Sequence, residues 1–580
     1  MIRKLLIITI ILNLSLITYH LSLFTYHLSL ITPNSSLFTH HLSLITHHSS
    51  LHAQPAVVKN AAKSVFSLTT FSADGSLLAS GHGVFVGTDG EAVSALKPFD
   101  GAARAVVIDA QGNKMNVTRI LGLNETYDVI HFRVDGKTTP APIASVASAA
   151  QQDAWLVGYG LKSPEIKATR VKSVEKFMDK YNYYILPMNA PDNTTGCPFV
   201  NMYGQVIGLL QMSTTSFDTH AVDAAYARSL TSSALSFNRN IGIPVALPAD
   251  ENQARLFLIM AGQSGDSLKY VSAADDFIRQ FPALNDGYNA RAFIEAAAGE
   301  YDRADETMKT AIRKAAPRDE AHYNYAKLQY DNALYGRHWT LDGAYAEASE
   351  ACRISPEPLY RHLQAQIHYA RNEYQQALDI LQQLSADKKF STPELLHEQA
   401  LCRDKLNAPA SEVIALLDSA INTTDTLRLN EAAPYFFTRA QIYDREGQYR
   451  EAVFDYTRYE YLMQGRLGAP FYHLRGQAAM KGRLYQQGLG DLAHALLLEP
   501  GEPTYYAEMA NAQLRVNKPE EAIETARRCV NLAPEYAEGY LLLGLAQVQA
   551  KQKAEGLANL RKAKELGNEQ AESLIEKYSK

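Results

Sequence analysis

The chain has 580 residues, 20% of them charged, and a formal net charge of −6 at pH 7, which excludes the basic footprint of a nucleic-acid-binding protein. A chain of this length forms several domains, because single hydrophobic cores stop growing near about 250–300 residues. The 46% hydrophobic content is typical of soluble globular protein. Its cysteines lie far apart without a CxxC pair, which indicates buried free thiols, not a zinc site or disulfide framework, and we expect no metal or cofactor: Cys197, Cys352, Cys402 and Cys529.

Residues 1–53 differ from the rest of the chain. Met1–Lys4 is a short positive start and Leu5–Leu12 is apolar apart from one threonine, the pattern of a signal peptide. A histidine-containing tract of seven-residue repeats follows, and histidine tracts are candidate metal sites. This one carries no carboxylate or thiol and resembles a duplicated DNA segment. We expect a leader over 1–53, Gln54 as the mature N-terminus, and export to the periplasm or cell envelope with no transmembrane segment in the mature chain.

Residues 54–230 are rich in short runs of valine, isoleucine and aromatic residues. Turn signals such as Asp74-Gly75 and Asp89-Gly90 separate them at spacings near ten residues. This pattern predicts a β-sandwich or barrel, and periodicity alone does not choose between the two. The predicted strands are Val65–Phe71, Leu77–Gly87, Ala92–Leu96, Ala105–Ile108, Met115–Leu121, Val129–Val134, Ala154–Gly158, Tyr183–Pro187 and Val206–Gln211.

Residues 253–580 show helical periodicity and an internal repeat of 34 residues in windows that start at 469, 503 and 537. Each window has a large residue at position 4 and small residues at positions 8, 20 and 27, and proline stands at position 32 of the first two. This pattern resembles the tetratricopeptide (TPR) repeat, in which the small residues let two helices pack closely. The expected packing residues include Tyr472, Gly476, Ala495, Tyr506, Ala510, Ala522, Pro534, Tyr540, Gly544 and Ala563.

The same repeat register continues upstream with more drift, and 321–357 and 393–432 read as helix pairs with inserted loops. We therefore expect eight or nine helix pairs beginning near Gln253. One pair cannot bury its apolar face alone, so the pairs should stack into a superhelix with a concave groove. Residues 231–252, with Pro244 and Pro248, are interpreted as a linker.

Three motifs in 54–230 follow one another in an order that can be compared with known families. They are Ser80–Ala102, Tyr127–Val134 and the loop Asn193–Asn201, which reads NTTGCPFVN. Together they resemble trypsin-like serine proteases, particularly the bacterial HtrA/Deg type. The resemblance implies a chymotrypsin-like double barrel, with Lys97 at the histidine position, Asp128 retained as the aspartate, and Thr195 at the serine position.

These substitutions remove the chemistry of the triad, which needs a neutral imidazole to carry the nucleophile's proton. Lys97 could replace it only with a strongly lowered pKa, whereas a nearby Asp128 carboxylate favours the charged amine, so an ion pair is expected instead. Thr195 is internal and lacks the N-terminal amine that activates threonine nucleophiles. Cys197 also replaces a glycine of the loop that forms the oxyanion hole.

Two catalytic alternatives remain open. In one, Thr195 and Lys97 form a dyad. In the other, the Cys197 thiol is the nucleophile and His131 or His82 is the base. The first would use the family's nucleophile position with a different base, and the second a position two residues later.

The sequence therefore predicts an exported pseudoprotease that binds protein. In the leading hypothesis the TPR groove captures a peptide or partner protein, and the barrel is a second recognition or scaffold module. One alternative is a trypsin-like peptidase that uses Thr195 or Cys197 and recruits substrates through the repeats. Another is an envelope scaffold with a featureless groove. Some aromatic residues of the repeats either line the groove or pack between helices: Tyr435, Phe436, Tyr456 and Tyr459.

Overall fold

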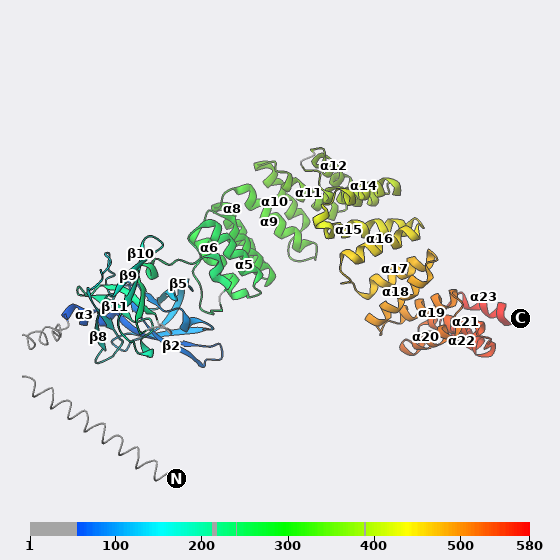
Figure 1. Ribbon diagram of the computed structural model, residues 1–580. Coiled ribbons are helices and arrows are strands. Elements are labelled where there is room, and N and C mark those ends of the chain that lie inside the picture. Colours follow the sequence, from blue (N-terminus) through cyan, green and yellow to red (C-terminus); the bar gives the residue numbers. More distant parts are fainter. Residues whose placement is uncertain (1–54, 212–216, 239, 388–389, 580) are drawn as a thin grey trace, which may run out of the picture. The chain divides into compact units, whose positions relative to one another are not determined.

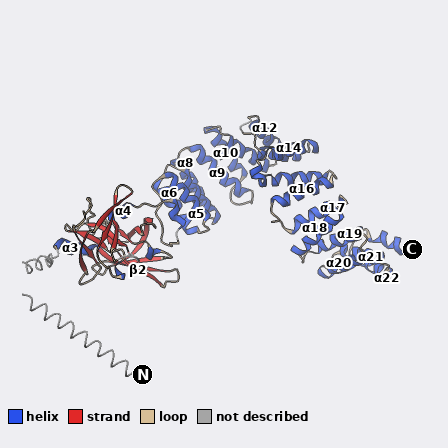
Figure 2. Ribbon diagram, viewed as in Figure 1, coloured by secondary structure: helices blue, strands red, loops and turns tan. Residues whose placement is uncertain are grey.

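A computed structural model describes residues 55–579, except 212–216, 239 and 388–389. The predicted leader and Gln54 lie outside the described residues. The chain forms two compact units, the first ending at Gly265 and the second beginning at Asp266. Strands make up most of the first unit and helices the second (Figures 1 and 2). No helix within the described ranges is long and apolar enough to cross a membrane.

The first six strands close into an antiparallel barrel in the order β1-β2-β3-β6-β5-β4. A short helix, α3 (Ala56–Ala61), precedes them. Side chains that alternate along the strands fill the barrel, where Phe66 packs on Phe85 and Phe132 with ring centroids 4.7 and 5.9 Å away. The strands are β1 (Val65–Phe71), β2 (Leu77–Phe85), β3 (Glu91–Ser94), β4 (Arg104–Ile108), β5 (Lys114–Asn124) and β6 (Val129–Val134).

The next seven strands form a second antiparallel sheet in the order β8-β7-β11-β12-β13-β10-β9. The predicted pair of chymotrypsin-like β structures is confirmed, although the second is an open sheet and not a closed barrel. Four of its strands, β8, β9, β11 and β13, are absent from the predicted strands. In β8 and β9 the reason is that IKATR and SVEKF carry little apolar alternation. The strands are β7 (Asp153–Val157), β8 (Ile166–Arg170), β9 (Ser173–Phe177), β10 (Tyr181–Leu186), β11 (Pro198–Asn201), β12 (Val206–Gln211) and β13 (Thr219–Asp223), and α4 (Ala224–Ser229) follows.

The segment interpreted as a linker, 231–252, packs on the barrel. The Ile120 N–H donates to the Pro244 carbonyl at 2.8 Å, and the Ala246 N–H donates to the Ile120 carbonyl at 2.7 Å. Ile241 and Ile243 are buried in the barrel core. The alternating isoleucines in this segment therefore return the chain to the barrel before α5 (Glu251–Gln263).

The second unit is an all-α repeat array, as predicted. In the described residues it contains eight consecutive helix pairs, α7–α8 to α21–α22, between α6 (Ser267–Gln280) and α23 (Ala571–Ser579). A short η5 (Thr426–Ala432) stands in the longer segment before α15. The paired helices are α7 (Asn285–Ala297), α8 (Tyr301–Lys314), α9 (Arg318–Ala333), α10 (Leu341–Ile354), α11 (Pro358–Ala370), α12 (Tyr374–Ser385), α13 (Pro393–Lys405), α14 (Ala410–Thr423), α15 (Ala433–Arg445), α16 (Tyr449–Leu462), α17 (Ala469–Lys481), α18 (Tyr485–Leu498), α19 (Pro503–Arg515), α20 (Pro519–Leu532), α21 (Ala537–Gln549) and α22 (Lys553–Glu565).

Small residues set the spacing within these pairs. A Cβ added at Gly544 would lie 2.8 Å from the Gly556 carbonyl oxygen, so α21 and α22 approach as closely as their backbones allow. Of the ten predicted packing residues, seven are buried, Tyr506 and Tyr540 are half-buried, and Pro534 is exposed in the turn after α20. The four cysteines are free, and all but the half-buried Cys352 are buried.

Two consecutive helix pairs, α15–α16 and α17–α18, each contain an arginine that is held by carboxylates. In α17 and α18, Arg475 bonds the Asp491 carboxylate through two nitrogens at 2.8 and 2.9 Å, and its third nitrogen lies 2.6 Å from Glu460 of α16. Arg439 of α15 makes the same paired contact with Asp455 of α16. Because Arg475 and Asp491 are both less than 10% exposed, each charge depends on the other for compensation.

Replacement of Asp491 by alanine should therefore destabilise the array strongly. Loss of one partner of a buried ion pair costs about 3–5 kcal/mol in the free energy of unfolding, because the other charge stays buried. Urea unfolding followed by helical circular dichroism measures the effect. The control is Glu350→Ala, which removes the exposed partner of Arg353 in α10 and should leave the midpoint nearly unchanged. Equal midpoints for the two variants would contradict this assignment.

Candidate functional site

The loop that carries Thr195 is held by main-chain bonds to both sheets. The Thr195 carbonyl accepts from the His82 N–H of β2 at 3.1 Å. The next residue, Gly196, donates its N–H to the Leu210 carbonyl of β12, also at 3.1 Å. A turn of 3₁₀-helix, η3 (Asp192–Thr194), leads into this point. The backbone of the loop therefore joins the barrel to the second sheet.

Gly196 is required at this position for two reasons. Its φ of +81° lies in the left-handed region, which favours glycine. A Cβ there would stand 2.2 Å from the His82 carbonyl oxygen, too close for any side chain. The glycine that the sequence motif shares with proteases thus has a structural role here, independent of the residue before it.

Lys97 and Asp128 lie together, but not as the predicted ion pair. Lys97 begins η2 (Lys97–Phe99), and its main-chain N–H donates to Asp128 Oδ1 at 2.8 Å. Its amine is solvent-exposed and forms no ion pair with Asp128 in the described part of the chain. Burial raises the pKa of Asp128, and the N–H groups of Lys97 and Leu96 together with the charge of the Lys97 amine oppose that shift. The Asp128 carboxylate accepts from the main-chain N–H of residue 97, and this contact does not depend on the side chain at that position.

The hydroxyl of Thr195 is not joined to either of them. Thr195 is half-buried, and its Oγ1 has no hydrogen-bond partner among the described residues. Main-chain contacts thus join Lys97 to Asp128 and Thr195 to His82, while a proton path from the Thr195 hydroxyl to a base is absent from the described side chains.

Cys197 lies in the core of the second sheet. It is fully buried with Phe199 and Leu210, and burial raises the pKa of its thiol to about 12. The base considered for it, His131, is buried in β6, where its Nδ1 lies 3.1 Å from the Leu230 carbonyl, and burial lowers its pKa. A thiol that stays protonated and inaccessible is inert as a nucleophile.

His82, the other base considered, contacts the loop through its main-chain N–H and also through its ring, which hydrogen-bonds the Asn193 main chain. Its ring packs beside Tyr159 with centroids 6.0 Å apart, and its Nδ1 is buried without a partner. Burial lowers the pKa of this imidazole. The sequence predicted that His82 lies in a strand, but it did not predict that the ring packs beside Tyr159.

Sequence reasoning missed an aromatic cluster beside Asp128. The Tyr127 ring lies 4.5 Å from that of Phe177 and 5.5 Å from that of Tyr226, and Tyr181 completes the group. Tyr127 stands in a recognised motif, but its neighbours come from β9, β10 and α4, whose proximity no local pattern indicates.

Over the described ranges, no group of three potential metal ligands occurs.

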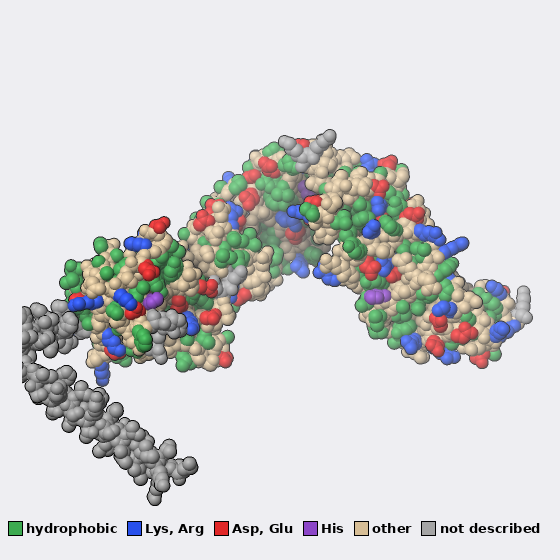
Figure 3. Space-filling view, in the orientation of Figure 1, with side chains coloured by type: hydrophobic (Ala, Val, Ile, Leu, Met, Phe, Trp, Pro, Cys, Tyr) green, Lys and Arg blue, Asp and Glu red, His purple; other side chains and the backbone are tan. Residues whose placement is uncertain are grey.

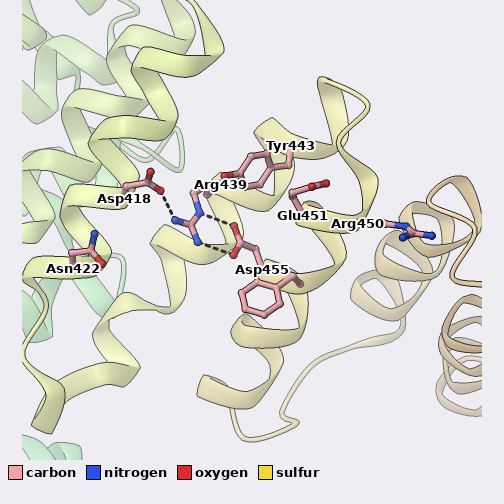
Figure 4. A pocket seen from close by; sticks show the side chains of 8 residues that line it. Asp418, Asn422, Arg439, Tyr443, Arg450, Glu451 and Asp455 are labelled. Atoms are coloured by element: carbon pink, nitrogen blue, oxygen red, sulfur yellow. Dashed lines mark hydrogen bonds and ion pairs between the residues drawn. The ribbon is translucent and has the colours of Figure 1, made fainter.

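A hollow lies in the array, between α14, α15 and α16. It has a volume of about 580 Å³ and is lined by charged and aromatic side chains (Figure 4). Arg439 at its base is bound by Asp418 and Asp455, so its charge is already compensated. On the face seen in Figure 3, acidic and basic side chains are interspersed along the array. The described side chains of this hollow thus present a mixed surface.

No known family model matches the chain. Among solved structures, the active form of the Rv3671c protease from M. tuberculosis is 15% identical, with 30% of this chain and 85% of that chain covered and a TM-score of 0.27. The serine endoprotease from Yersinia pestis is 17% identical; the match covers 30% of this chain and 62% of that chain, with a TM-score of 0.27. The inactive form of the Rv3671c protease is 15% identical; the match covers 29% of this chain and 87% of that chain, with a TM-score of 0.25. The strand order described above, and not these distant likenesses, supports the fold assignment.

Gly196→Ala should destabilise the β domain more than Gly75→Ala. Both glycines have φ above +80°, but nothing lies within 4 Å of a Cβ at Gly75. The matched variant therefore measures the backbone strain alone, and Gly196→Ala adds overpacking of about 1–3 kcal/mol. Urea unfolding followed by the fluorescence of Trp155, buried in β7, compares the two in a Trp339→Phe background, which removes the chain's other tryptophan. Indistinguishable midpoints would show that the loop does not depend on this close contact.

Proposed function

We propose that the protein is an exported binding protein in which a TPR array captures a peptide or partner protein. The trypsin-like domain is, in this proposal, a pseudoprotease that serves as a second recognition or scaffold module. Export rests on the sequence pattern of residues 1–53. The assignment of the helix pairs as TPR repeats rests on the 34-residue register, whose small positions Ala510, Ala522 and Ala563 are fully buried.

One observation carries the binding proposal: the first helices of the pairs repeat a polar constellation. In α11 and α13, Gln366 donates to Glu398 at 2.9 Å; in α17 and α19, Gln477 donates to Glu508 at the same distance. A histidine stands four residues before each glutamine, His362 and His473. Helix packing alone does not require these polar groups, whereas amide and carboxylate oxygens can accept the main-chain N–H groups of an extended peptide.

The aromatic residues weighed in the sequence divide between the two roles. Tyr435 and Tyr456 are buried between helices, which favours packing. Phe436 and Tyr459 are half-buried and keep part of their surface for a ligand. Recognition in this proposal therefore depends more on the polar first-helix surface than on an aromatic stripe.

The second candidate, a peptidase using Thr195 or Cys197, has less support. Thr195 Oγ1 lacks a base within hydrogen-bond reach among the described groups, and the Cys197 thiol is buried and protonated. A working site would have to assemble a base and expose the nucleophile on binding substrate.

The full chain should not cleave a broad library of fluorogenic peptides. Without a base to accept the nucleophile's proton, turnover should equal that of the Thr195→Ala and Cys197→Ala variants. Circular dichroism confirms that all three proteins are folded. Turnover that disappears in one variant would identify the nucleophile and refute the pseudoprotease proposal.

The full chain should bind peptides of an immobilised random decapeptide library through its first helices. Replacement of both Gln366 and Gln477 by alanine should weaken binding about tenfold, because each lost hydrogen bond contributes about 0.5–1.5 kcal/mol. Fluorescence anisotropy with the selected peptides gives the dissociation constants. The control, Gln376→Ala, removes an exposed glutamine of the second helix α12. If no peptide binds, or if the control weakens binding equally, the groove proposal is wrong.

A further inference from the structure

A small pocket opens where the first helices of three consecutive pairs meet. It has a volume of about 120 Å³ and is lined from α9, α11 and α13, with one residue from α12. Its base is apolar and almost fully buried, formed by Ala365, Leu381 and Cys402. Its rim is half-buried and formed by Tyr330, Tyr369 and Glu398.

We propose that this pocket takes one leucine-sized apolar side chain of an extended peptide bound along the first helices. The inference rests on the proposed peptide-binding function and names the residue class that the array selects. The volume of about 120 Å³ supports it, since an apolar cavity of about 150 Å³ binds the six-carbon ring of benzene and a leucine side chain has only four carbons. A tryptophan side chain would exceed the space.

The chemistry of the base excludes a charged side chain. Ala365 and Leu381 offer no polar partner, and burial raises the pKa of the Cys402 thiol to about 12, so it stays neutral. An ammonium or carboxylate placed there would lose its hydration without compensation, which costs several kcal/mol. An aliphatic side chain loses no hydrogen bonds and buries its apolar surface.

The rim holds a carboxylate in a fixed position. Glu398 Oε2 lies 2.5 Å from His362 Nε2, and Glu398 Oε1 accepts from Gln366 Nε2 at 2.9 Å. Both partners come from α11, so Glu398 is oriented by the neighbouring pair before any ligand arrives. Each carboxylate oxygen has two lone pairs and keeps one for a peptide N–H, which places the main chain at the rim and its side chain inside.

Saturation-transfer NMR with blocked amino acids tests the pocket apart from the peptide-binding function. The probes are N-acetyl-leucinamide, N-acetyl-lysinamide and N-acetyl-tryptophanamide, each at millimolar concentration with the full chain. The expected result is a signal from the leucine methyl groups and weaker signals from the lysine and tryptophan probes. Cys402→Leu fills the base and should weaken leucine binding at least about tenfold. Ala297→Leu, at an exposed site in α7, is the matched control.

Tyr369→Ala supplies a second variant that keeps the base intact, which decides the matter if Cys402→Leu does not fold. It removes a wall, so leucine binding should weaken while tryptophan binding strengthens. Equal signals from the three probes, or an unchanged leucine signal in the folded variants, would overturn the pocket assignment. Peptide binding in the library experiment together with either result would leave the proposed function standing and refute only this pocket. A leucine signal without any binding of library peptides would support the pocket and refute the proposed peptide-binding function.

Discussion

A helix pair in this array has no core of its own, and everything in the second unit follows from that constraint. Each pair buries its apolar face only against its neighbours, so the spacing between helices must be small and regular. The backbone approach at Gly544 and the buried alanines at the same repeat positions provide that spacing. The seams between pairs are consequently the places where polar side chains meet and where the pocket at Cys402 opens.

The β domain shows a different dependence, in which main-chain contacts hold both the loop that carries Thr195 and the turn that begins at Lys97. Gly196 packs on the His82 carbonyl, and Asp128 binds the N–H of residue 97. Neither contact involves the side chain at position 97 or 195. A substitution at either of those two positions would therefore leave the loop and the turn in place.

The predictability of the molecule follows the range of the interactions. Strong local patterns gave the apolar strands and the 34-residue helix pairs, because periodic side chains on one face indicate burial. Edge strands β8 and β9 have weak patterns, and the return of Ile241 and Ile243 to the barrel depends on partners more than a hundred residues away. The predicted ion pair between Lys97 and Asp128 was wrong about the group that Asp128 binds: the carboxylate accepts from the backbone N–H of Lys97, and a backbone contact cannot be read from side-chain identities. The pocket at the α9–α11–α13 seam combines residues from 330 to 402, which no motif could place together.

The two enclosed arginines also give the array a mechanical landmark. Arg439 reaches back to Asp418 of α14, and Arg475 reaches back to Glu460 of α16, so each joins its own pair to the preceding one. In the described residues these links run through α14 to α18. A force applied to the C-terminus would peel the array pair by pair, from α23 inward. Peeling should stall on reaching α17–α18, because unfolding this pair separates the buried Arg475 both from Asp491 within the pair and from Glu460 of α16.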